Sequence, residues 1–235
     1  MLSWKNSQEQ NVEGVELDNI IAVDGPAGSG KSTVARLLAQ RLNFFYIDTG
    51  AMYRALTLKA IRDDIDLEDS RALAKLAQET ELDIVNDDSL NIKVMLDKED
   101  VTSLIRTPEL TNKVAYIARV PEVREIMKLN QRKIGARGKS VFEGRDIGTV
   151  VFPNAKYKFY IDANFNERVN RRYKELVEKR KILTFEDVAK DLKSRDDKDI
   201  NRKIGPLKRA EDATYLDTTD ISIEKVVDKL MDHVK

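Results

Sequence analysis

Residues 25–32 (GPAGSGKS) constrain this chain more than any other segment, because they match the pattern G-x-x-x-x-G-K-[ST] at every position. An apolar run over 20–23 precedes them, and a helical pattern over 33–42 follows. A strand, a glycine-rich loop and a helix in this order are typical of a phosphate-binding loop. Glycine lets successive backbone N–H groups turn toward phosphate oxygens, and the helix start adds unpaired N–H groups. The segment therefore predicts a nucleoside triphosphate site rather than an incidental glycine-rich turn.

Two side chains of this loop carry the expected ligand chemistry. Lys31 can reach the outer phosphates, and the Ser32 hydroxyl can ligate Mg²⁺. The residues expected to bind ATP are Gly25, Pro26, Ala27, Gly28, Ser29, Gly30, Lys31, Ser32 and Thr33.

Composition argues against several classes of function. Lys plus Arg and Asp plus Glu both number 41, so the formal net charge is zero, whereas nucleic-acid and membrane-surface binders need a positive field. The chain has no cysteine, which excludes thiolate chemistry, and its single histidine, His233, lies two residues from the end. Residues 1–18 are polar and lack the apolar core of a signal peptide. We therefore expect a flexible N-terminal extension over 1–18 on a cytoplasmic protein, and a monomer because no long apolar helix seam is present.

Strand and helix patterns alternate along the chain, which predicts an α/β fold with a parallel sheet. Short strands joined by a polar turn are expected over 82–85 and 91–96, as a small antiparallel insertion. Core strands are expected over 20–23, 44–47, 140–143, 157–162 and 214–217. Helices are expected over 33–42, 52–63, 68–78, 108–117, 122–137, 165–180, 184–197 and 222–234.

Residues 48–54 (DTGAMYR) follow a predicted strand and begin a helix. Thr49 is a candidate helix cap, and a purely structural role is one interpretation of this segment. In the other interpretation, Arg54 binds a second phosphate group, because a guanidinium contacts phosphate through two parallel hydrogen bonds.

Residues 143–153 (EGRDIGTVVFP) follow the strand expected over 140–143. Ligands of open α/β sheets bind beyond the carboxyl ends of the strands, which is where this segment would lie. Arg145 can meet a phosphate, and Asp146 can accept a proton from the amino group of a base. The alternative is a local ion pair on a turn.

Residues 195–203 (RDDKDINRK) form a mixed charge run that leads into a Gly-Pro loop. Such a run is usually a solvated helix face. A charged helix entering a flexible loop is also a candidate lid, because phosphoryl transfer needs water excluded and arginines delivered to the transferring group.

In combination, three segments of the chain resemble the bacterial-type cytidylate kinases, and the resemblance extends over 20–234. The segments are residues 48–54, residues 144–153, and the pattern Arg195-Asp196-Asp197 with Asp199-x-Asn201-Arg202. The resemblance implies transfer of a phosphoryl group from ATP to CMP or dCMP, with Mg²⁺. It also implies a P-loop NTPase-type parallel core, a nucleotide-binding insertion and a helical lid. The implied boundaries are a domain over 19–235, with its core at 19–52, 138–183 and 207–235, a nucleoside monophosphate-binding region at 53–137 and a lid at 184–206.

The resemblance also implies roles for single residues. The acceptor phosphate would be held by Arg54, Arg145 and Arg202, the cytosine by Arg124 and Asp146, and the sugar by Arg195 and Asp199. Thr49 belongs to the same acceptor site, and the residues implied in catalysis are Lys31, Arg145, Arg195 and Arg202. Some family members carry a base-contacting serine where this chain has Ala115, so Tyr116 or Asn112 would have to replace that contact, or base recognition is simpler here.

Two alternatives stay open from the sequence. The first is a related kinase with another small acceptor, such as AMP, UMP, dTMP or shikimate. The second is a non-enzymatic nucleotide switch, against which a second phosphate site argues, since a switch has no use for one.

Overall fold

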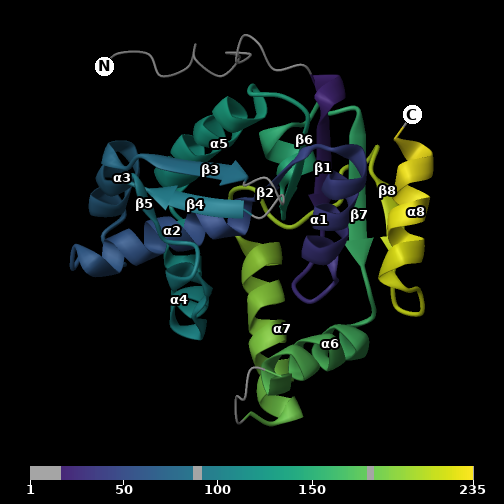
Figure 1. Cartoon of the computed structure of the whole chain (residues 1–235). Coiled ribbons are helices and arrows are strands. Elements are labelled where there is room, and N and C mark those ends of the chain that lie inside the picture. The colour runs from purple at the N-terminus through teal and green to yellow at the C-terminus, as the bar shows by residue number, and fades with distance from the viewer. Residues whose placement is uncertain (1–16, 87–91, 179–182, 235) are drawn as a thin grey trace.

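The computed structural model describes residues 17–86, 92–178 and 183–234 (Figure 1). Most of the extension predicted over 1–18 and the end of the helix predicted over 165–180 lie outside the described residues. Within the described residues, no helix is long and apolar enough to cross a membrane.

The predicted parallel sheet is confirmed. Its five strands lie in the order β2-β6-β1-β7-β8, and every neighbouring pair is parallel. The strands are β1 (Ile20–Asp24), β2 (Phe45–Asp48), β6 (Ser140–Gly144), β7 (Tyr157–Asp162) and β8 (Thr214–Asp217). All residues of β1 and β6 are buried, so both faces of the sheet are covered at its centre, as apolar parallel strands require.

The helices surround this sheet in groups. Helices α2 to α5 lie to its left in Figure 1, α8 lies to its right, and α6 and α7 extend below. The helices are α1 (Lys31–Leu42), α2 (Thr49–Arg62), α3 (Ser70–Glu79), α4 (Pro108–Ala118), α5 (Pro121–Gly135), α6 (Phe165–Glu178), α7 (Phe185–Asn201) and α8 (Ile223–His233). Three shorter turns are η2 (Leu17–Asn19), η3 (Leu104–Arg106) and the π-helical turn η4 (Ile147–Val151).

The main core joins the sheet to α5 and η4. The rings of Phe142 and Phe152 lie 4.8 Å apart between their centroids, and both side chains are at most 2% exposed. A Cβ on Gly135 would lie 2.8 Å from Cζ of Phe152, so α5 comes this close only because the residue is glycine. Burying each such aromatic ring contributes about 1.5–3 kcal/mol.

The antiparallel insertion is also confirmed, with one more strand than predicted. Strands β3 (Leu82–Asn86), β4 (Ile92–Leu96) and β5 (Glu99–Asp100) form a separate sheet. The last strand has two residues, too few to show an alternating pattern in the sequence. Val94 and Leu96 of this sheet pack with Ala51 and Ala55 of α2, which fixes the insertion against the start of that helix.

Three neighbouring strands therefore end at one edge of the main sheet. The phosphate-binding loop follows β1, the loop containing Arg145 follows β6, and α2 follows β2. The crevice beyond such an edge is where ligands of open α/β sheets bind.

Candidate active site

A cleft of about 2070 Å³ opens at this edge of the sheet, between the phosphate-binding loop, α2, α4 and α7. Single-ligand pockets usually measure about 300–1,000 Å³, so this cleft has room for two ligands. It brings together all the predicted acceptor-site residues, namely Thr49, Arg54, Arg124, Arg145, Asp146, Arg195, Asp199 and Arg202. From the predicted ATP-binding set it is lined by Ala27, Gly28, Gly30, Lys31, Ser32 and Thr33, whereas Gly25, Pro26 and Ser29 are buried beneath the loop surface.

Backbone geometry explains the glycines of the phosphate-binding loop. Gly25 has φ 155°, and a Cβ there would overlap the carbonyl oxygen of Ile161. Gly30 has φ 87° and is the N-cap of α1, so the unpaired N–H groups of that helix open into the cleft. The loop thus has the backbone shape and the dipole orientation that bind phosphate.

Lys31 bends back over this loop. Its ammonium donates to the carbonyl oxygen of Pro26 at 3.2 Å. Burial, with the nearby Arg145 guanidinium, lowers the pKa of Lys31 to about 7, although Glu143 acts in the opposite direction. A bound anion would restore the charged form, so this lysine is suited to binding phosphate oxygens.

Two arginines of α6 donate hydrogen bonds to backbone carbonyl oxygens of the phosphate-binding loop. Arg168 donates to the carbonyl oxygen of Ala27 at 3.0 Å, and Arg171 donates to that of Ser29 at 3.2 Å. Neither residue was predicted from the sequence, because a charged helix gives no signal that two of its arginines face a loop some 140 residues earlier.

Glu143 begins the segment 143–153, but no role for its side chain was predicted from the sequence. Ser32 Oγ donates to its Oε2 at 2.7 Å, and the Tyr46 hydroxyl donates to its Oε1. Burial raises the pKa of this carboxyl, and the neighbouring Asp48 raises it further. An acidic residue near the carboxyl end of a core strand was the available signal.

The hydroxyl of Ser32 and the carboxylate of Glu143 are oxygen donors of the kind that Mg²⁺ prefers. No group of three or more His, Cys, Asp or Glu side chains suited to a metal occurs in the described residues. Mg²⁺ with a nucleotide is usually held by one or two carboxylates and the phosphates, so the donors present fit this ion.

The start of α2 differs from the prediction in one detail. Asp48, not Thr49, is the N-cap, and it accepts the backbone N–H of Ala51 at 2.9 Å. Thr49 is the first helical residue, and its hydroxyl donates to the carbonyl oxygen of Glu143 at 2.7 Å. The helix therefore begins three residues earlier than expected, directly where β2 ends.

The side chain of Asp48 also holds Arg54 in the cleft. Its Nη2 lies 2.8 Å from Asp48 Oδ2. Burial pushes the pKa of Asp48 upward, but the Arg54 guanidinium and the Ala51 N–H outweigh it and lower that pKa. The guanidinium is thus fixed at the N-terminal end of α2, in the wall of the cleft.

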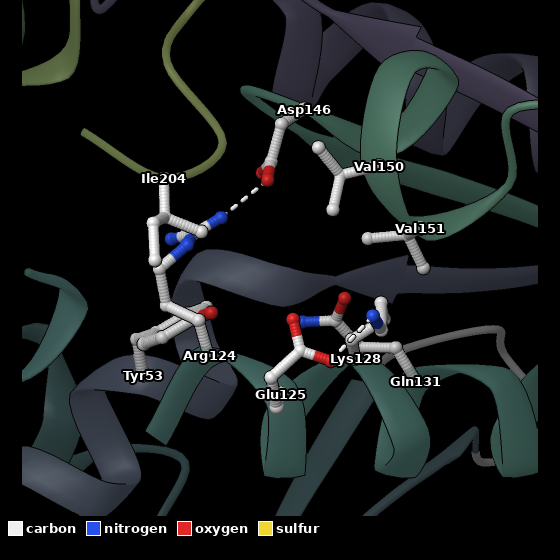
Figure 2. A pocket seen from close by; sticks show the side chains of 9 residues that line it. All are labelled: Tyr53, Arg124, Glu125, Lys128, Gln131, Asp146, Val150, Val151 and Ile204. Atoms are coloured by element: carbon white, nitrogen blue, oxygen red, sulfur yellow. Dashed lines mark hydrogen bonds and ion pairs between the residues drawn. The ribbon is translucent and has the colours of Figure 1, made fainter. Parts of the chain in front are cut away.

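The loop after β6 and the end of α7 meet in the wall of the cleft. Arg145 Nε donates to Asp199 Oδ2 at 2.7 Å. Asp146 pairs with Arg124, and its other oxygen lies 3.4 Å from Arg202 Nη2. Figure 2 shows Arg124 reaching from α5 to Asp146, with Ile204 beside them.

Helix α7 extends four residues beyond its predicted end, so Asp199 belongs to the helix and Arg202 is its C-cap. Arg195 lies in the cleft wall, 3.7 Å from Asp191. After the helix, Arg202 Nε donates to the carbonyl oxygen of Gly205, which packs against Asp146. The predicted lid segment therefore touches the predicted base-binding pair.

Asn112 and Tyr116, the two candidates for the polar contact that Ala115 lacks, lie differently relative to the cleft. Ala115 and Asn112 both line the cleft. Tyr116 is 38% exposed, and the Arg119 guanidinium carbon lies 5.1 Å from its ring centroid. Asn112 is therefore better placed than Tyr116 to supply a polar contact near Ala115.

Comparison with known proteins is consistent with this geometry. A family model described as cytidylate kinase matches residues 21–235. The cytidylate kinase of Carboxydothermus hydrogenoformans is 47% identical over 212 residues, which cover 90% of this chain and 95% of that protein. The cytidylate kinase of Bacillus subtilis is 43% identical over 215 residues, with 92% and 96% covered.

Proposed function

This chain belongs to the cytidylate kinase family, and we propose on that premise that its cleft holds ATP and a cytidine monophosphate at the same time. The enzyme is a nucleoside monophosphate kinase that phosphorylates CMP and dCMP with ATP as the donor. The observation that carries the residue assignment is the pairing of two phosphate sites in one cleft. The phosphate-binding loop forms one wall, and Arg54, Arg145 and Arg202 extend into the same space.

The reaction needs positioning and charge neutralisation more than proton transfer. An oxygen of the acceptor phosphate attacks the γ-phosphorus of ATP, and a new P–O bond forms. The bond from this phosphorus to the β–γ bridging oxygen breaks, and ADP leaves with that oxygen. The attacking oxygen is already ionised at neutral pH, so no side chain has to act as a general base.

Cationic side chains offset the charge that gathers during this transfer. Lys31 holds the donor phosphates, and Arg54, Arg145 and Arg202 hold the acceptor phosphate. Arg195 lies beside them on α7 and acts with them in catalysis. Each hydrogen-bond donor directed at developing charge typically contributes about 2.7–4 kcal/mol to the lowering of the barrier.

Ser32 would hold Mg²⁺ together with the donor phosphates, and Glu143 lies next to it. When bound there, the ion would supply positive charge that offsets the charge of the donor phosphates. Glu143 orients the Ser32 hydroxyl through the hydrogen bond of 2.7 Å and is itself fixed by Tyr46.

Asp146 and Arg124 suit the recognition of cytosine. The Asp146 carboxylate can accept from the exocyclic amino group, and Arg124 can donate to the ring nitrogen and carbonyl oxygen. Their mutual ion pair keeps both groups in place at low exposure. Arg195 and Asp199 then contact the sugar, and Thr49 completes the acceptor site.

We divide the chain accordingly into a core (19–52, 138–183 and 207–235), a monophosphate-binding region (53–137) and a lid (184–206). The division is supported by the separate antiparallel sheet and by the contact of the loop after α7 with Asp146.

An assay of acceptor-dependent ADP formation tests the function. ATP is held constant, and CMP, dCMP, UMP, AMP, dTMP and shikimate are compared. We expect turnover with CMP and dCMP above all others. Preference for AMP or shikimate would overturn the assignment, and ATP binding without any acceptor-dependent ADP would indicate a nucleotide switch. In Asp146→Asn we expect a weaker preference for CMP over UMP, because the amide presents a donor as well as an acceptor.

A further inference from the structure

We propose that Asp24 is a positioning residue that anchors the acceptor-side loop, and so aims Arg145 and Asp146, from the end of the donor strand. The inference rests on the proposed function, since it concerns how the acceptor half of that site is held.

Asp24 is the last residue of β1 and directly precedes the phosphate-binding loop. Its Oδ1 accepts the backbone N–H of Ile147 at 2.9 Å, and its Oδ2 accepts that of Gly148 at 2.8 Å. Asp24 is 5% exposed. One buried carboxylate therefore joins two loops whose residues are more than 120 positions apart in the chain.

The acceptor-side loop needs such an anchor. Strand β6 ends at Gly144, and the π-helical turn η4 begins at Ile147. The first N–H groups of a helical turn have no partner within that turn. The side chain of Asp146 makes no cap hydrogen bond, and Asp24 supplies both acceptors instead. Because the bonded N–H groups directly follow Asp146, they fix the direction in which Arg145 and Asp146 leave the backbone.

The surroundings of Asp24 make this anchor sensitive to charge. The groups that face it are Asp146 and Arg145 from the loop, Tyr160 from β7, and Lys158 packed across Gly148. Burial raises the pKa of Asp24 to about 6, although the two backbone hydrogen bonds act in the opposite direction. Protonation turns one acceptor oxygen into a hydroxyl, so the anchor weakens as the pH falls through about 6.

Asp24→Asn tests the role with little change of shape. The amide nitrogen would face a backbone N–H, so one of the two hydrogen bonds is lost. We expect the KM for CMP to rise about tenfold and kcat to fall, because a buried hydrogen bond to a charged group is lost. The Kd for ATP measured without acceptor should stay within about twofold of the original protein.

Asp69→Asn is the matched control. Asp69 also accepts two backbone N–H groups, those of Arg71 and Ala72, but it caps α3 and does not line the cleft. We expect unchanged kinetics for this variant. Unchanged kinetics in Asp24→Asn would overturn the proposal, as would an equal loss of affinity for ATP and CMP.

A pH series adds a readout that a merely structural role would not move. Below pH 6, the KM for CMP should rise more steeply in the unmodified protein than in the Asp24→Asn variant. The ionisation of CMP affects both proteins equally, so the difference between the two profiles reports on Asp24. Parallel profiles would contradict the proposal.

Hydrogen exchange of the Ile147 and Gly148 amides in the unmodified protein tests the anchor directly, even if the Asp24→Asn variant fails to fold. We expect their protection to fall between pH 7.5 and pH 5.5, after correction for intrinsic rates, and unchanged protection would overturn the anchor. If the unmodified protein forms no CMP-dependent ADP, the proposed function fails, whereas hydrogen exchange and ATP binding still report on Asp24.

Discussion

Arg168 Nη1 lies 2.6 Å from Asp196 Oδ2, and the two side chains are only 10% and 11% exposed. Arg168 belongs to α6 and Asp196 to α7, and the same nitrogen of Arg168 donates to the carbonyl oxygen of Ala27 in the phosphate-binding loop. One buried ion pair thus connects the donor loop to the helix that carries Arg195 and Asp199. This contact, with the apolar packing of Val169 and Leu176 against Val188 and Leu192, fixes α7 where it lines the cleft.

Asp196→Asn should therefore destabilise the protein. The substitution removes the nearer of the two carboxylates beside the buried Arg168 guanidinium and leaves Asp162, at 3.9 Å, as its charged partner. We expect the free energy of unfolding to fall by about 1.5–3 kcal/mol, as for a lost hydrogen bond to a charged group. Urea unfolding followed by circular dichroism measures the change. Asp228→Asn is the control, because Asp228 forms an ion pair with Arg41 on the surface, where such pairs contribute little. Equal stability of the two variants would contradict the prediction.

Lys31→Ala should fold normally and lose activity. Lys31 makes one hydrogen bond within the protein, to Pro26, among the interactions of the described residues, so its removal costs the fold little. We expect turnover to fall by roughly two to four orders of magnitude, as for a principal electrostatic group. Steady-state kinetics and thermal unfolding are measured side by side, with Lys75→Ala on α3 as the control. Near-normal turnover of a folded Lys31→Ala protein would exclude the role.

The lowered pKa of Lys31 gives a second, independent measurement. With a pKa of about 7, the free lysine is mostly neutral at pH 8 and mostly charged at pH 6. Bound phosphates favour the charged form, so ATP binding should take up about one proton more at pH 8 in the original protein than in Lys31→Ala. The excess should nearly vanish at pH 6. Calorimetry in buffers of different ionisation enthalpy measures it, and equal uptake by both proteins at pH 8 would contradict the lowered pKa.

Local patterns in the sequence were enough to predict the sheet and the phosphate-binding loop, whereas the acceptor-side residues Arg124, Arg195, Asp199 and Arg202 were assigned only through the family resemblance. The strand, the glycine loop and the helix around residues 25–32 lie within one short segment, so their signal is complete in the sequence. Asp48 rather than Thr49 caps α2 because β2 ends at Asp48. Both residue types are good caps, so the sequence alone does not show which of the two adjacent residues is the cap.

The contacts that position the site were not predictable in the same way. Asp24 with Ile147, Ser32 with Glu143, and Arg168 with Ala27 each join residues more than 100 positions apart. Such pairs depend on the register of β1 against β6 and on the packing of α6, which no local pattern specifies. The turn η4 also gave no signal, because a π-helical turn has no distinctive residue pattern.

Gly205→Ala should damage the acceptor site specifically. Gly205 has φ +57°, and a Cβ there would overlap Asp146 Oδ2 and the Arg124 guanidinium. The loop after α7 must then move away from the pair assigned to cytosine, so we expect the KM for CMP to rise by about tenfold or more and the Kd for ATP to change little. A single displaced contact of about 1.4 kcal/mol already accounts for a factor of ten.

Gly138→Ala is the matched control for this substitution. Gly138 also has a positive φ, of +147°, but a Cβ there would meet only Phe45 Cε2, at an ordinary distance of 4.0 Å. Both variants therefore carry backbone strain and lose stability, whereas only Gly205→Ala pushes against Asp146 and Arg124. If both variants keep the original KM for CMP, the loop after α7 does not form part of the acceptor site. If both raise it equally, backbone strain alone is responsible, and the assigned contact between the lid and the base-binding pair is wrong.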